Sequence, residues 1–284
     1  MQNLRDYITL TKPRLNTLAL FTTLAGFYLG APSPFPWVAA LLAMAGTTLV
    51  AGGCGTLNQW FEVEEDKKMR RTRKRPLVMG RLKGDRAFWY GVGLSVGGVL
   101  VLYLWVNVLT AFLGACALFS YLVLYTPLKK YSSLCTVVGA IPGAIPPMMG
   151  WAAVRDTVGP EGLCLFAILF FWQMPHFLAI GWLYREDYER AGFPMLSVVD
   201  PQGGVTGLMA VAYAFALWPV SLLPTYLHMT GSLYFWAALL MGLGFILYSA
   251  LLAWKKSLYY ARGLFWLSIT YLPVLFALMC VNKV

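Results

Sequence analysis

Three polar side chains at a regular spacing are the first candidates for chemistry in a chain that is otherwise mostly apolar. Asn58, Glu62 and Asp66 lie at positions i, i+4 and i+8, so they share one face if the preceding apolar helix continues through them. Proteins usually bind Mg²⁺ through one or two carboxylates together with the oxygens of substrate phosphates. We therefore predict that these three residues are catalytic and ligate Mg²⁺.

A strongly basic run follows the three polar residues. Its arginines offer the bidentate geometry that suits phosphate, but a basic loop after a membrane helix is also what a cytoplasmic orientation requires, whatever the protein does. We favour the topological explanation for the basic residues as a group. Acidic residues contribute little to topology and are costly near membrane depth, so for the three polar residues we favour function. The basic run consists of Lys67, Lys68, Arg70, Arg71, Arg73, Lys74 and Arg75.

The composition indicates a membrane protein. Hydrophobic residues make up 59% of the 284 residues and charged residues only 12%, whereas about a quarter of the residues of a soluble domain are charged. The many aromatic residues fit interfacial belts and packed helices better than a stacking surface for bases, so we expect no nucleic-acid partner. The five cysteines form no close pair that would indicate a metal or redox motif.

Nine apolar stretches reach about the 20 residues needed to cross a bilayer. Continuous apolar runs without alternation exclude a membrane barrel, so the predicted fold class is all-α, as a single polytopic domain over residues 1–284. The run from 87 to 128 must fold back on itself, and Asn107 is the expected turn residue. The nine predicted spans are 15–31, 36–61, 87–106, 108–127, 134–154, 162–183, 205–226, 233–254 and 263–281.

The distribution of Lys and Arg predicts the orientation. Nearly all basic residues between the spans fall on one side, and only Arg155 and Lys283 fall on the other. Because short cytoplasmic loops carry the excess of Lys and Arg, we predict a cytoplasmic N-terminus and an external C-terminus. The expected location is a bacterial cytoplasmic (inner) membrane, with the two longest loops, about 62–86 and 184–204, on the cytoplasmic side over a central cavity.

The two long cytoplasmic loops follow the second and the sixth span. This spacing suggests a weak internal repeat, in which spans 1–4 correspond to spans 5–8 and a ninth span is added. The second loop opens with the charged and aromatic segment 184–190, which includes Arg185, Asp187 and Tyr188. Facing the first loop, this segment would enclose a metal-bound polyanion from the other side. The alternative is an ordinary amphipathic surface helix.

Two predicted spans contain residues that a membrane helix rarely carries without a reason. His176 follows Pro175 in the sixth span, and an ionisable residue inside a span is a functional hypothesis by default. It could carry a proton, ligate the metal of a cofactor or make a packing hydrogen bond. The fifth span contains Pro142, Pro146 and Pro147 beside small residues. These should break or kink the helix and leave room for a ligand, although helix packing could use the same small residues.

These residues resemble those of a known family. The pattern Asn58-x3-Glu62-x3-Asp66-x4-Arg71-Thr72-x2-Arg75-Pro76 is similar to the first acidic motif of the UbiA superfamily of intramembrane prenyltransferases, whose members also have nine helices. Within the superfamily, the chain most resembles the branch that farnesylates protohaem IX (haem B). The closer matches, which cover most of residues 11–200, are Asn58-Gln59 with Glu62, Tyr125-Thr126-Pro127-Leu128-Lys129, Gly143-Ala144 with Pro146-Pro147, Gly150-Trp151, Pro175-His176-Phe177 and Asp187-Tyr188 with Ala191-Gly192.

The resemblance implies that the acidic loops hold Mg²⁺ and the diphosphate of farnesyl diphosphate, and that the farnesyl group is transferred to a vinyl group of haem B, giving haem O. Glu62 departs from the family pattern, in which aspartate is usual, but it keeps a carboxylate. The second acidic motif usually has aspartates four residues apart. Here Tyr184 and Tyr188 stand at that spacing, with Glu186 and Asp187 between them, and we place Asp187 first as a catalytic metal ligand. The expected substrate-binding residues are Arg71, Arg75, Lys129, Lys130, Arg185, Tyr125 and Tyr188.

The implied reaction requires neutralisation of the leaving diphosphate, which Mg²⁺ and basic side chains provide. His176 would ligate the haem iron, or deliver the water or proton that completes the product. The implied partners are farnesyl diphosphate, haem B, the lipid bilayer and, downstream, haem-modifying or oxidase-assembly proteins. The alternatives are a prenyltransferase for an aromatic quinone precursor and a transporter of an anionic solute, which would place substrate-binding charge near the bilayer midplane.

Overall fold

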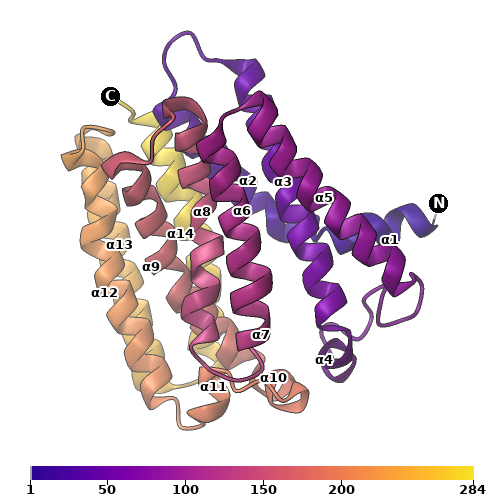
Figure 1. Cartoon of the computed structure of the whole chain (residues 1–284). Coiled ribbons are helices and arrows are strands. Elements are labelled where there is room, and N and C mark those ends of the chain that lie inside the picture. Colours follow the sequence, from indigo (N-terminus) through magenta and orange to yellow (C-terminus); the bar gives the residue numbers. More distant parts are fainter. Residues whose placement is uncertain (1) are drawn as a thin grey trace.

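The protein is a bundle of long helices with short helices around it (Figure 1). The structure, a computed structural model, describes residues 2–284, and these residues form no β-sheet. The long helices are α2 (Pro13–Gly30), α3 (Trp37–Phe61), α5 (Gly84–Trp105), α6 (Val108–Phe119), α8 (Cys135–Arg155), α9 (Gly159–Leu183), α12 (Gly204–Tyr226), α13 (Ser232–Lys255) and α14 (Leu258–Val281). The short helices are α1 (Gln2–Leu10), α4 (Val63–Lys68), α7 (Thr126–Leu128), α10 (Arg185–Ala191) and α11 (Leu196–Val199).

Eight helical segments among residues 2–284 are long and apolar enough to cross a membrane. They correspond to the second through ninth predicted spans, so the all-α, multi-pass fold class is confirmed. One of them joins α6 to α7 through the π-helical residues Ser120–Tyr125. Helix α2 occupies the first predicted span, but its 18 residues include Arg14 and Asn16, and it is not among the eight.

The turn predicted in the long apolar run is confirmed, whereas the proline-rich spans differ from expectation. Asn107 caps α6, and its side-chain oxygen accepts a hydrogen bond from the backbone N–H of Thr110 at 2.7 Å. Helix α8 continues unbroken through its three prolines, and α9 continues through Pro175. Membrane helices tolerate proline because neighbouring helices and local adjustments satisfy the backbone groups that it frees. The sequence predicts that these prolines break or kink α8, and the break does not occur.

Glycines bring α2 and α8 into close contact. A Cβ atom on Gly150 would lie 1.9 Å from the carbonyl oxygen of Thr23, and one on Gly26 would lie 2.1 Å from that of Pro147. Neither distance is compatible with a real side chain, so only glycine allows this approach. Small residues at such crossings are typical of membrane helix interfaces, where packing rather than water exclusion holds helices together. The crossing fixes α2 beside the proline-containing helix.

The two long loops meet at the end of the bundle opposite the C-terminus, where α4, α10 and α11 lie (Figure 1). A small hydrophobic cluster joins the loops there, so they form one surface over the helix ends. This cluster buries Met69 from the first loop and Phe193 from the second almost completely, at 1% exposure each. Its buried members are Met69, Cys135, Tyr188, Ala191, Phe193 and Met195.

Candidate active site

Asn58, Glu62 and Asp66 line one cavity of about 210 Å³ at this end of the bundle. Helix α3 ends at Phe61 and α4 begins at Val63, so the helix does not continue unbroken. Two backbone hydrogen bonds cross the break, from Glu62 N to the Asn58 carbonyl at 3.1 Å and from Asp66 N to the Glu62 carbonyl at 2.8 Å. They preserve the four-residue register, and the three side chains therefore come together as their spacing predicts.

Each of the three side chains contacts a cation from elsewhere in the chain. Lys129 donates to both carboxylate oxygens of Glu62, at 3.1 and 3.2 Å. Lys12 donates to the side-chain oxygen of Asn58 at 2.6 Å, and Arg75 pairs with Asp66. All three acceptor residues are buried, with 1–2% exposure. Buried charges require such partners because solvation is lost.

The pKa values of these groups reflect burial opposed by neighbouring charge. Burial alone would raise the pKa of Glu62, but Lys129 and Lys12 together hold it below its ordinary value. For Asp66, burial raises the pKa more than Arg75 lowers it. Burial and the charge of Arg75 lower the pKa of Lys12 to about 7. The charges of the site are thus closely coupled, so binding of a further ion would shift these pKa values.

The donor set fits Mg²⁺ that is shared with a substrate. Oδ1 of Asp66 is buried without a hydrogen-bond partner, although Oδ2 pairs with Arg75. Among residues 2–284 no group of three or more His, Cys, Asp or Glu side chains is arranged to hold a metal. The protein therefore supplies only part of a coordination shell, which is the usual situation for Mg²⁺ bound together with phosphate oxygens.

Other predicted site residues divide into two groups. Arg71, Arg75, Lys129, Tyr125 and Tyr188 line the same cavity as the three polar residues. Lys130, Arg185 and Asp187 do not line it.

The residues outside the cavity have partners of their own. Lys130 pairs with Glu65 at 2.6 Å. Asp187 accepts hydrogen bonds from the backbone N–H groups of Arg70 and Arg71 at 3.3 Å each, and pairs with Arg190. These contacts hold the pKa of Asp187 below its ordinary value, against the effect of burial. The metal role of Asp187 remains a prediction, because its carboxylate faces an adjacent pocket and already has three partners.

An apolar cavity of about 300 Å³ continues from the charged cavity into the bundle. Lys12, Tyr121 and Phe177 line both cavities, so the two adjoin. Pro142 and Pro146 line the apolar part, in agreement with the prediction that this region of α8 leaves room for a ligand.

His176 lines the apolar cavity and is held on three sides. Its ring stacks against Trp172 and Phe265, with ring centroids 5.0 and 5.3 Å away. Nδ1 lies 2.7 Å from the hydroxyl oxygen of Ser268, and that hydroxyl donates to the carbonyl of Phe265 at 2.6 Å. Because the hydroxyl proton is already used, we assign the imidazole proton to Nδ1. In the neutral ring this assignment leaves Nε2 as an acceptor.

Two lining residues were not predicted from the sequence. Lys12 precedes the first predicted span, where orientation alone accounts for a basic residue, and nothing local connects it to Asn58, which is 46 positions away. Tyr121 lies in the π-helical segment Ser120–Tyr125, which ends at the predicted residue Tyr125. Single-turn π segments often occur at functional sites, but a sequence pattern does not reveal them.

Comparisons place this arrangement among known proteins. Residues 19–279 match the model of the UbiA prenyltransferase family. The chain is 47% identical over 289 residues to the protoheme IX farnesyltransferase of Solibacter usitatus, with 99% of each protein covered.

Two solved structures share the fold. A structure described as digeranylgeranylglyceryl phosphate synthase in membranes has a TM-score of 0.84 at 18% identity, with 99% of each chain covered. A UbiA homolog from Archaeoglobus fulgidus, bound to GPP and Mg²⁺, has a TM-score of 0.65 at 15% identity, and the match covers 96% of this chain and 99% of that one.

Proposed function

The chain belongs to the UbiA prenyltransferase family, and we propose that it transfers a farnesyl group from farnesyl diphosphate to a vinyl group of haem B, giving haem O. The observation that carries this proposal is the continuity of a charged cavity with an apolar cavity. A prenyl diphosphate has the same division, with an anionic head and an apolar tail. The acceptor is inferred from the relative in Solibacter usitatus, which is named a protoheme IX farnesyltransferase.

Asn58, Glu62 and Asp66 would hold Mg²⁺ at the head of the donor. The unpartnered Oδ1 of Asp66 is available without the loss of any protein contact. The UbiA homolog from Archaeoglobus fulgidus was solved with GPP and Mg²⁺, which supports the same requirement here. When bound, the metal neutralises charge on the diphosphate and so makes it a better leaving group.

Lys12, Lys129 and Arg75 would supply the remaining positive charge. All three line the charged cavity, and each already holds an oxygen of a proposed metal ligand. When substrate binds, we propose that these cations turn from the protein oxygens toward the diphosphate. The acids then become free for the metal, and the buried charge remains balanced.

The apolar cavity would hold the farnesyl chain and keep water away from the allylic cation. As C1 of the farnesyl group bonds to the terminal vinyl carbon, positive charge appears on the adjacent carbon. A water oxygen bonds there, and its proton must be removed. Nε2 of His176 is the acceptor that the hydrogen bond to Ser268 leaves available, so we propose that it holds this water and takes the proton.

The same proposal includes a topology. We propose that α2 is a ninth span, since it packs against α8 inside the bundle. The loops that carry α4 and α10 would lie on the cytoplasmic side of a bacterial inner membrane, because the first of them contains the whole basic run. The product would then be passed to haem-modifying or oxidase-assembly proteins at that membrane.

Acceptor binding distinguishes this function from that of a prenyltransferase for a quinone precursor. Purified protein should bind haem B with a change in its absorption spectrum, and a small aromatic carboxylic acid should not compete. Tight binding of the aromatic acid without haem binding would instead support a prenyltransferase that acts on an aromatic quinone precursor.

A further inference from the structure

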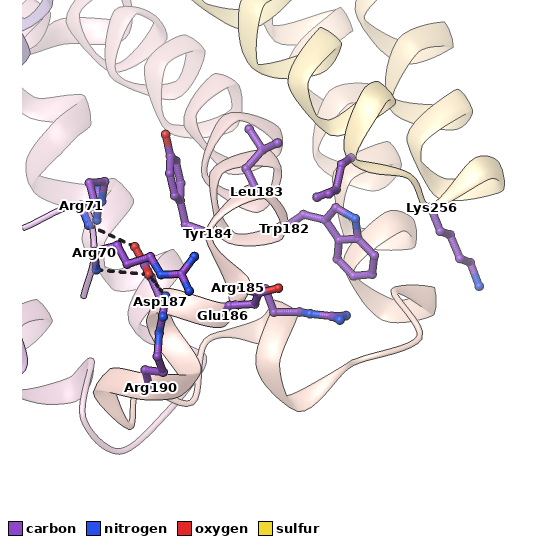
Figure 2. Close-up of a pocket in the computed structure, with 11 residues that line it drawn as sticks. Arg70, Arg71, Trp182, Leu183, Tyr184, Arg185, Glu186, Asp187, Arg190 and Lys256 are labelled. Atoms are coloured by element: carbon purple, nitrogen blue, oxygen red, sulfur yellow. Dashed lines mark hydrogen bonds and ion pairs between the residues drawn. The ribbon is translucent and has the colours of Figure 1, made fainter. Parts of the chain in front are cut away.

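A second pocket lies beside the active site, at the same end of the bundle, and the proposed mechanism does not use it. Its volume is about 650 Å³. Arg70 and Arg71 stand on one side, and Trp182 and Lys256 stand on the other, with Arg185 between them (Figure 2). The pocket combines a basic rim with an apolar wall.

The acidic residues of this pocket do not neutralise its rim. Five cationic side chains line it, against the carboxylates of Glu186 and Asp187. Asp187 is already engaged by two backbone N–H groups and by Arg190. Among residues 2–284, the side chains of Arg70 and Lys256 form no ion pair with a carboxylate. The rim therefore keeps positive charge for an anionic ligand.

The apolar wall is suited to a flat ligand. Trp182 contributes its indole, and Arg185 lies over that ring with its guanidinium carbon 5.4 Å from the ring centroid. Leu183 and Leu258 continue the apolar surface. A ligand with an extended apolar ring and an anionic edge would match both parts.

The acceptor needs space in addition to the donor cavities. The charged and apolar cavities measure about 210 and 300 Å³, about 510 Å³ together, which is within the roughly 300–1,000 Å³ typical of a pocket for one ligand. The farnesyl chain and the diphosphate would occupy them. The larger pocket adjoins the charged cavity, because Arg71 lines both.

On the basis of the proposed function, we propose that this pocket binds the carboxylate edge of the acceptor. Haem B carries two propionates on one edge of its ring and two vinyl groups on the opposite edge. With the propionates at Arg185 and Lys256, the vinyl edge points toward Arg71 and the donor cavity. The rim thus selects a dicarboxylate porphyrin and orients it for transfer.

The test compares haem B with its dimethyl ester, which lacks the negative charges. In the unmodified protein, esterification should weaken equilibrium binding and raise the acceptor KM by roughly tenfold, the lower end of what a charge-assisted hydrogen bond supplies. Lys256→Gln should weaken binding of haem B but not of the ester. The loss of affinity caused by esterification, the ester penalty, should therefore be smaller in this variant. The KM for farnesyl diphosphate should not change.

Lys255→Gln is the matched control. Lys255 precedes Lys256 but does not line the pocket, and its ammonium group stacks on Trp254 at 3.8 Å. This variant should keep the full ester penalty. An equal penalty in Lys256→Gln and the unmodified protein would overturn the proposal. A Lys256→Gln defect that depends on anionic lipid in vesicles, and not on esterification, would overturn it in favour of a lipid-headgroup site.

Separate measurements of binding and turnover distinguish failure of the pocket assignment from failure of the proposed function. Porphyrin binding is measured by absorption without farnesyl diphosphate, so it reports on the pocket alone. If binding shows the expected coupling between Lys256 and the propionates but no farnesylated porphyrin forms, the proposed function fails while the pocket assignment stands.

Discussion

Lys129 donates hydrogen bonds to both carboxylate oxygens of Glu62, and the two side chains are 9% and 3% exposed. The residues are 67 positions apart, so this ion pair joins the break between α3 and α4 to the segment after α7. The pair balances two charges that would be costly to bury alone. The pair also holds two proposed site residues next to each other: Lys129, which would contact the diphosphate, and Glu62, which would ligate the metal.

Breaking this pair should affect stability and activity differently. Lys129→Met leaves Glu62 as an unpaired buried charge and should destabilise the protein by about 3–5 kcal/mol. The double variant with Glu62→Gln removes both charges, so it should recover most of the stability but remain inactive. Thermal unfolding in detergent, followed beside turnover, measures both effects. Full recovery of turnover in the double variant would contradict the proposed roles.

Arg75→Lys should weaken use of farnesyl diphosphate while leaving the protein folded. Lysine keeps the charge that orients the loop but loses the bidentate geometry of guanidinium. The expected result is a KM for the donor raised about tenfold, which corresponds to about 1.4 kcal/mol. Arg73→Lys is the control, because Arg73 belongs to the same basic run but does not line the cavity. If both variants had the same kinetics, Arg75 would contribute only to membrane orientation and not to diphosphate binding.

His176→Ala should bind haem B normally but lose turnover by roughly 10²-fold, the lower range for a general base. Ser268→Ala should cause a smaller loss of turnover. The imidazole ring is still present, but its proton is no longer held at Nδ1 by the Ser268 hydroxyl. Ser249→Ala is the matched control, since the Ser249 hydroxyl is also buried and bonds only to its own helix, at 2.9 Å. Added imidazole should partly restore His176→Ala. Loss of haem binding in that variant would instead indicate that His176 ligates the iron.

Gly150→Ala should destabilise the protein through the contact of α8 with α2. The added Cβ would meet the Thr23 carbonyl at 1.9 Å, so the helices must separate. Gly97→Ala on α5 is the control, because beyond its chain neighbours and the nearby backbone of its own helix no atom lies within 4 Å of its added Cβ. There the substitution should be neutral or stabilising, by up to about 1 kcal/mol from helix propensity. Similar unfolding temperatures for both variants would show that the close contact is not required.

The sequence was sufficient for features that depend on local pattern. Apolar length predicts the long helices, and an asparagine near the middle of a double-length apolar run predicts the turn at Asn107. The spacing of Asn58, Glu62 and Asp66 survives the helix break because two backbone hydrogen bonds maintain it. The internal repeat and the membrane orientation remain predictions.

Features that depend on tertiary contacts were not available from the sequence. Lys12 reaches Asn58 only because α2 and α3 pack beside each other. Asp187 is the first choice among the acids of the second loop as a metal ligand, but its carboxylate accepts hydrogen bonds from the backbone of the first loop. The prolines of α8 predict a break or a kink, yet the helix is continuous because neighbouring helices can satisfy the freed backbone groups.

The most direct measurement is the mass of the porphyrin product after incubation with farnesyl diphosphate, haem B and Mg²⁺. The unmodified protein should form a hydroxyethylfarnesyl porphyrin, and removal of Mg²⁺ with a chelator should abolish it. Asp66→Asn should reduce the product by at least about 10²-fold. Glu64→Gln, an exposed acid on the same helix, should match the unmodified protein. Product at the unmodified rate from Asp66→Asn, or without Mg²⁺, would contradict the proposed site.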